Sequence, residues 1–380
     1  MQSDAVIHLE RNLMPDIKPK RVSNYELFFD LVFVLAISKL TGVLHNSHFI
    51  LQDLLVYIAA FIGILSIWFF MTYYTNRYAQ INRNDVYGII ALMFIVGQMA
   101  INMTATPSTL VFLIYQILYA LAYGVILLLY YLHGRRNSHF DEDMIYTMRI
   151  LALVVAFHTT HVLLVLFGLM QISDLVFLYP FLPLLLVSIT RWNYRIRVNF
   201  PHLVERCQLI TIISFGETVI ALINNYPLNK MPVESLIFFF AMAFLFIMYI
   251  SQTFLNMDHH QDANPRTLIF SHVSLIMGLN LFTIALEKLP HHLNDLAIIY
   301  FLIGINLYYL SLLANSTYNK EGFQINKKQF LVYLLILAGF SLAICLFKSN
   351  LLIIALLTAG LTYSMTHTGY LYRQAARQRL

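Results

Sequence analysis

The chain has 380 residues, of which 59% are hydrophobic and only 11% are charged. Roughly a quarter of the residues in a soluble domain are charged, so this composition excludes an ordinary soluble protein and predicts a membrane protein. The formal net charge is +5 at pH 7, which on such a chain reports membrane orientation and contact with anionic lipid rather than binding to nucleic acid. The two cysteines, Cys207 and Cys345, lie within apolar segments and predict no disulfide framework or zinc site.

Residues 1–24 are polar and lack the apolar core of a cleaved signal peptide, so we expect a cytoplasmic segment before the first span. About 20 mostly apolar residues are needed to cross about 30 Å of hydrocarbon as a helix. The sequence therefore predicts an all-α polytopic bundle over 25–372, followed by a cytoplasmic tail at 373–380. Its twelve predicted spans are 25–44, 52–74, 86–105, 109–132, 145–170, 174–190, 203–223, 235–255, 267–288, 295–315, 329–347 and 350–371.

Basic residues predict the orientation of these spans. With the N-terminus in the cytoplasm, 20 of the 24 Lys and Arg residues fall on the cytoplasmic side, as the positive-inside rule requires. We therefore expect a bacterial plasma-membrane protein with both termini in the cytoplasm. Glu26 and Glu205 open the first and seventh spans 179 residues apart, which suggests two parallel six-helix halves, 25–190 and 203–372.

Ionisable and amide side chains are concentrated in the first, third, fifth, seventh and ninth spans, whereas the second span carries a single charge, Asp53, at its start. Such groups are costly in hydrocarbon unless they face a protein interior, a partner or water. We therefore expect those odd spans to line a polar interior and the other spans to face lipid. The candidate path for protons, ions or substrate consists of Glu26, Asp30, Gln98, His158, His161, Glu205, Glu217 and His272, with Arg83 and Arg206 as cytoplasmic charge partners.

Structural roles are the alternative for several of these residues. Glu26 and Asp30 would also be stable near a helix N-terminus, where the helix dipole favours anions and Arg21 or Arg83 is close enough in sequence to pair. Glu217 would also suit a structural bond to His158 or His161 on another helix. The two histidines lie three residues apart on one helix face, but this spacing alone is weak evidence for a metal site, and we predict no metal and no cofactor.

Four segments resemble the low temperature requirement A (LtrA) family of bacterial membrane proteins. They are YELFFDLVFVLAI from Tyr25, ERCQLITIISFGETVI from Glu205, FIMYISQ around Tyr249 and FSHVSLIMGLNLFTIALEKLPHH from Phe270. In the seventh-span motif, Cys207, Gln208, Phe215 and Thr218 replace the family's Phe, Gly, Leu and Ser, while the acidic residues are kept. The resemblance implies a multispan inner-membrane protein whose family name reflects growth in the cold, and it implies no particular chemistry.

Three functions are compatible with this pattern. The preferred hypothesis is a proton- or ion-linked secondary carrier of a small solute, because membrane-embedded acids and histidines occur without a nucleotide-binding loop. The second is an intramembrane enzyme that uses His158, His161 and Glu217 on a lipid-like substrate. The third is a non-catalytic membrane factor that supports growth in the cold. The expected partners are the lipid bilayer and a small solute or lipid, and the sequence leaves the oligomeric state open.

Overall fold

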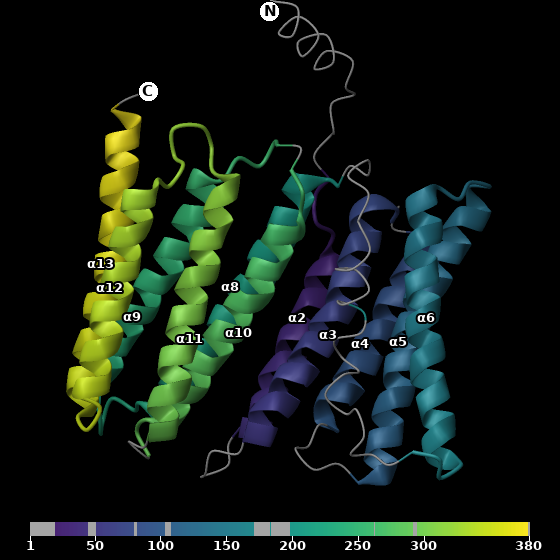
Figure 1. Cartoon of the computed structure of the whole chain (residues 1–380), viewed down its shortest axis with the longest axis horizontal. Helices are drawn as coiled ribbons and strands as arrows, with labels where there is room; N and C mark the ends of the chain where they lie inside the picture. The colour runs from purple at the N-terminus through teal and green to yellow at the C-terminus, as the bar shows by residue number, and fades with distance from the viewer. Residues whose placement is uncertain are drawn as a thin grey trace, which may run out of the picture.

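The computed structural model describes residues 20–44, 51–79, 82–102, 108–170, 183, 198–261, 263–291 and 295–378. These residues form a bundle of long helices that run roughly side by side (Figure 1). Within the described ranges, 11 helices are long and apolar enough to cross a membrane. They correspond to eleven of the predicted spans, which confirms the helical membrane bundle. The remaining predicted span, 174–190, lies outside the described residues apart from residue 183.

The membrane-length helices have well-defined bounds. They are α2 (Asn24–Leu40), α3 (Leu51–Arg77), α4 (Arg83–Ile101), α5 (Thr109–Arg136), α6 (Glu142–Leu166), α8 (Phe200–Asn225), α9 (Pro232–Ile250), α10 (Arg266–Lys288), α11 (Asp295–Ala314), α12 (Lys327–Leu346) and α13 (Leu351–Arg377). Short 3₁₀ turns extend α2 over Thr41–Leu44 and α11 over Asn315–Tyr318, and a π-helical segment, Ser251–Asn256, extends α9.

Polar residues set the starts of several helices by accepting hydrogen bonds from backbone N–H groups that have no partner within the helix. Capping boxes occur at Ser23 before α2, at Asn82 before α4 and at Asn326 before α12. Asp141 caps α6 by accepting from the Met144 N–H at 2.7 Å. These caps lie at the ends of apolar runs, so they fix where each predicted span begins.

Contacts among the helix ends establish the relative directions of α2, α3, α6 and α8. Lys20, just before α2, donates to the Ala79 carbonyl just after α3, at 3.0 Å. Near the end of α3, Arg77 forms an ion pair with Asp143 in the first turn of α6, and Asn76 lies 3.0 Å from His202 in the first turn of α8. Thus α2, α6 and α8 begin where α3 ends, and we call this end of the bundle the α2 end.

In Figure 1, α6 stands at one side of the bundle and α12 and α13 stand at the other, with α2, α8 and α10 between them. The helix α6 packs mainly on α5, and α12 packs mainly on α13. In the middle, α8 packs against α2, α3, α9 and α10. The helix α8 therefore connects the α2–α6 part of the bundle to the α9–α13 part.

The expectation that the second span faces lipid is wrong for α3. In its most apolar stretch, 78% of the residues are buried, as many as in α10, whereas only 17% are buried in α12. The buried side chains of α3 include Tyr57, Phe61, Trp68 and Tyr74. A helix whose middle is apolar all round is suited to a protein core as well as to lipid, so the lack of charge between its ends did not distinguish the two environments.

Helices α10 and α11 cross at a pair of glycines. A Cβ atom placed on Gly278 would lie 2.7 Å from the Gly304 carbonyl oxygen, and one placed on Gly304 would lie 2.5 Å from the Phe282 backbone nitrogen. Because both obstacles are backbone atoms, they cannot move aside by a rotamer change. Small residues permit this close approach of helix backbones in a membrane.

We expect Gly304→Ala and Gly278→Ala each to destabilise the protein by about 1–3 kcal/mol, because the added methyl group overpacks a backbone contact. The measurement is thermal unfolding of the purified protein in detergent micelles. Gly339→Ala on α12 is the matched control, because a Cβ there would meet nothing within 4 Å. Equal unfolding temperatures for Gly304→Ala and Gly339→Ala would show that α10 and α11 do not cross at these glycines.

Candidate functional site

The helix α8 carries most of the polar side chains that are buried in the middle of the bundle. Its N-cap, Asn199, accepts a hydrogen bond from the His202 N–H at 3.3 Å, and Pro201 occupies the first turn, where the lack of an N–H carries no penalty. From this start, α8 presents Arg206 and Glu217 toward α2, and Thr218 toward α10. The candidate site is therefore built around α8.

Arg206 is the centre of a buried ion cluster that joins α2, α3 and α8. Its guanidinium is fully buried and binds Asp30 with two hydrogen bonds, Nε to Oδ2 at 2.9 Å and Nη2 to Oδ1 at 2.6 Å. Its Nη1 also donates to Glu26 Oε1 at 3.1 Å. The planar fork of an arginine matches a carboxylate in this two-bond geometry. A single guanidinium thus holds two carboxylates of α2.

Helix α3 contributes neutral donors and acceptors to the same cluster. The Trp68 indole Nε1 donates to Asp30 Oδ1 at 2.7 Å, and Thr75 Oγ1 accepts from Arg206 Nη1 at 3.4 Å. The guanidinium also lies over the Trp68 ring, with its carbon 5.9 Å from the ring centroid. Asp30 is fully buried, and these contacts from two helices satisfy its oxygens.

The hydrogen bonds of His202 fix its tautomer. The Asn199 N–H donates to Asn76 Oδ1 at 2.9 Å, so the Asn76 amide group faces the other way and donates to His202 Nδ1 at 3.0 Å. His202 Nδ1 is therefore an acceptor, and the ring proton is on Nε2, which lies 3.2 Å from Glu26 Oε1. The formal charges of Glu26, Asp30 and Arg206 sum to one negative charge.

Lys20 adds a second cation at the α2 end, outside the spans. Its Nζ donates to the carbonyl oxygens of Thr75 and Ala79, which caps the end of α3. Burial lowers the pKa of Lys20, and the nearby carboxylates of Glu26 and Asp85 oppose that shift. Lys20 therefore brings positive charge close to the cluster.

A second acidic group lies further along the same pair of helices. The Ser38 hydroxyl of α2 donates to Glu217 Oε2 of α8 at 3.0 Å. Because Asp30 pairs with Arg206 and Ser38 pairs with Glu217, the residue numbers rise together and the two helices run parallel. Ser38 lies eight residues beyond Asp30, which is about 12 Å along a helix. Both Ser38 and Glu217 are half-buried, so the Glu217 carboxylate is less enclosed than Asp30.

The histidines of α6 lie elsewhere in the bundle. His158 Nδ1 lies 2.6 Å from Gln116 Oε1 of α5, and its ring stacks on Tyr119 with 5.1 Å between centroids. His161 meets the edge of Phe112, also on α5, at 5.2 Å. Both are buried between α5 and α6, whereas Glu217 bonds Ser38 between α2 and α8. The histidine pair and Glu217 therefore lie in different helix interfaces.

His272 of α10 belongs to a third polar group. Its Nδ1 lies 2.7 Å from the Leu268 carbonyl oxygen, so this nitrogen carries the proton, and its Nε2 lies 3.2 Å from the Tyr249 hydroxyl. The same hydroxyl lies 3.3 Å from the Cys207 carbonyl oxygen of α8. His272 is thus connected to α8 one residue beyond Arg206, through a tyrosine that sequence reasoning did not single out.

The remaining candidates are not part of these groups. Glu205 and Arg83 are exposed at the α2 end, and Gln98 is half-buried in α4. Of the two predicted charge partners, Arg206 is brought to Glu26 and Asp30, whereas Arg83 is exposed in the first turn of α4. Among the described residues, no three His, Cys, Asp or Glu side chains are arranged to hold a metal ion.

Sequence reasoning missed Trp68, Asn76 and His202, which complete the ion cluster. Trp68 and Asn76 lie on α3, the helix expected to face lipid, and His202 precedes the predicted seventh span. The residue types gave one signal, because Trp, Asn and His each carry a polar group that needs a hydrogen-bond partner when it is buried. The sequence could not indicate that the three would meet at one place.

We expect Arg206→Gln to destabilise the protein by about 3–5 kcal/mol, because it leaves two carboxylates buried without a compensating charge. Asp30→Asn should cost less, since Arg206 keeps Glu26 as a partner. The measurement is a double-mutant cycle by thermal unfolding in detergent, in which the double variant should lose less than the sum of the single losses. Arg83→Gln is the control for an exposed arginine. Strict additivity of Arg206→Gln and Asp30→Asn would contradict the pairing.

Comparison with known proteins shows the family of the chain. A search among curated proteins finds no match. Over residues 21–363, nearly the whole chain, the sequence matches the family described as bacterial low temperature requirement A protein (LtrA). This range contains both acidic residues of α2 and the whole of α8. The chain is therefore a multispan membrane protein of the LtrA family.

Proposed function

We propose that this protein is a proton-linked secondary carrier of a small solute and that its path follows the interface between α2 and α8. The observation that carries the proposal is that acidic side chains occur at two depths on this one pair of parallel helices. Glu26 and Asp30 meet Arg206 at the α2 end, and Glu217 meets Ser38 further along. Membrane-embedded acids that face other helices are typical of ion and proton paths.

The ion cluster is suited to close the α2 end of such a path. It connects α2, α3 and α8 through hydrogen bonds to a fully buried guanidinium. Separating these helices would expose or unpair charged groups, which is costly in a medium of low polarity. Protonation of Glu26 or Asp30 would weaken their attraction to Arg206 and make opening easier. Binding of a proton could thus favour the separation of α2 from α8.

Glu217 is the preferred proton carrier. It is half-buried, so it can exchange protons with a path more readily than the enclosed Asp30. Its partner, Ser38, is a neutral hydroxyl that can donate to a carboxylate or accept from a carboxylic acid. The Ser38–Glu217 pair can therefore persist in both protonation states, as a reversible proton site requires.

The arrangement of the helices supports the proposal that 25–190 and 203–372 are two halves of the same topology. In the first half α2 packs on α4, and α4 packs on α5. In the second half α8 packs on α10, and α10 packs on α11 in the same order. The parallel helices α2 and α8 would then be equivalent elements that meet where the halves meet. Carriers built from repeats often place their binding site at such an interface.

The carrier is favoured over the intramembrane enzyme by the separation of the polar groups. The enzyme hypothesis requires His158, His161 and Glu217 to act together, but the histidines face α5 and Glu217 faces Ser38 of α2. A purely structural membrane factor would use the ion cluster for stability alone. Measurements of flux and of stability on the same variants separate this possibility from the carrier.

We expect Glu217→Gln to abolish solute-driven proton movement while its unfolding temperature stays close to that of the wild type, because glutamine still bonds Ser38 but cannot bind and release a proton. The measurement uses proteoliposomes that contain a pH-sensitive dye and are challenged with amino acids, amines, sugars and organic anions in turn. Glu205→Gln is the matched control, because Glu205 is an exposed acid on the same helix.

Two results would contradict the proposal. One is solute-driven proton movement that is equal in Glu217→Gln and in the wild type. The other is wild-type protein that moves no protons with any solute of the panel, together with Glu217→Gln protein whose unfolding temperature falls as far as that of Asp30→Asn. The second result would assign Glu217 a structural role.

A further inference from the structure

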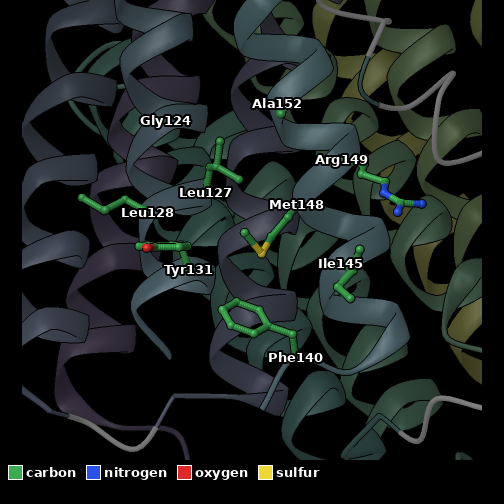
Figure 2. A pocket seen from close by; sticks show the side chains of 9 residues that line it. All are labelled: Gly124, Leu127, Leu128, Tyr131, Phe140, Ile145, Met148, Arg149 and Ala152. Carbon is green, nitrogen blue, oxygen red and sulfur yellow. The ribbon is translucent and has the colours of Figure 1, made fainter. Parts of the chain in front are cut away.

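A groove lies between α5 and α6 on a surface that the α2–α8 site does not use. Its volume is about 630 Å³, within the range of sites that hold small molecules. Figure 2 shows Leu127, Leu128 and Tyr131 of α5 on one side and Met148 of α6 facing them. Gly124 lines the groove without a side chain, and a Cβ there would meet nothing within 4 Å.

The surroundings of the groove are apolar and face outward. Leu121 and Leu128 of α5 and Leu153 of α6 are all more than half exposed, on helices that cross the membrane. Side chains of this kind on a membrane helix are in contact with hydrocarbon. Because water is absent there, the occupant of the groove must itself be apolar over most of its length. An acyl chain has this property.

Arg149 adds a charge to the same groove. It lies seven residues after the start of α6, which is about 10 Å along the helix. Its side chain is exposed and, within the part of the chain that the structure describes, forms no ion pair and no hydrogen bond. Arg149 lines the groove, and in Figure 2 its guanidinium projects from α6 away from Leu128 and Tyr131. The charge therefore lies at the edge of the groove, outside its apolar part.

An arginine at this depth requires an anion. The apolar stem of the side chain can lie along the helix while the guanidinium reaches the membrane interface, where the phosphates of lipids are found. The guanidinium binds phosphate through two hydrogen bonds. Arg135 and Arg136, exposed at the end of α5, add positive charge at the α2 end of this pair of helices and favour an anionic headgroup.

We propose that the α5–α6 groove binds an anionic glycerophospholipid, with an acyl chain against Gly124, Leu127 and Met148 and the phosphate group on Arg149. The volume and apolar lining fit the acyl chain, and the guanidinium, which has no ion pair among the described residues, fits the headgroup. The two parts lie side by side on one lipid-facing surface. The proposal does not rest on the transport function, because no residue of the ion cluster or of the Ser38–Glu217 pair lines the groove.

The experiment uses the full-length protein, delipidated in detergent and titrated with phosphatidylglycerol or phosphatidylcholine, with bound lipid counted by native mass spectrometry. Arg149→Gln should weaken phosphatidylglycerol binding by about tenfold or more, as expected for the loss of one charge-assisted contact. It should weaken phosphatidylcholine binding less, because the choline cation already offsets the charge of that lipid's phosphate. Gly124→Trp should weaken the binding of both lipids, because the indole fills the groove. The matched controls are Arg83→Gln, an exposed arginine on α4, and Gly339→Trp, where a Cβ also meets open space.

The proposal is overturned if Arg149→Gln binds phosphatidylglycerol as the wild type does, or if Gly339→Trp weakens binding as much as Gly124→Trp. It is also overturned if inorganic phosphate at millimolar concentration displaces the lipid completely, since the acyl chain would then contribute nothing. Should Gly124→Trp fail to fold, Met148→Asp provides the second test of the groove, because a carboxylate would repel both the acyl chain and the headgroup.

Discussion

The organisation of this bundle depends on the pairing of one buried guanidinium with two carboxylates. Arg206 cannot lose its proton under ordinary conditions, so its charge needs compensation wherever the helix places it. Asp30 and Glu26 provide that compensation from α2, and Trp68 and Thr75 complete the hydrogen bonds from α3. The charge on α8 therefore determines which helices lie beside it. Apolar packing alone would not select these neighbours, because in lipid one leucine-rich face is much like another.

The same pairing explains why α8 lies in the middle of the molecule. Its polar side chains are distributed on more than one face, with Arg206 and Glu217 toward α2 and Thr218 bonded to Thr283 of α10 at 2.8 Å. A helix with polar groups on several faces is unstable against lipid and must be surrounded by protein. By contrast, α12 has few such groups and remains largely exposed. The more faces of a helix carry polar side chains, the more of that helix is surrounded by protein, as the comparison of α8 with α12 shows.

The spans were predictable because the length of an apolar run is a local property of the sequence, set by the thickness of the membrane. The contribution of Arg206 and the acids of α2 was also foreseeable, since charged side chains in hydrocarbon need partners. The arrangement of helices was not, because it depends on contacts between residues far apart in the chain. For this reason His158 was expected to join Glu217 but faces Gln116 instead. Likewise, α3 was assigned to the lipid surface because an apolar helix looks the same in sequence whether protein or lipid surrounds it.

The central claim is that the Arg206 cluster holds α2 and α8 together at the α2 end. The most direct measurement is the distance between spin labels on Tyr25→Cys of α2 and Glu205→Cys of α8, two exposed positions within the first two turns of their helices. The labelled protein carries Cys345→Ala and retains the buried Cys207. The account predicts one narrow distance distribution with Arg206 in place and a longer or broader one in Arg206→Gln. The same narrow distribution in both proteins would contradict it.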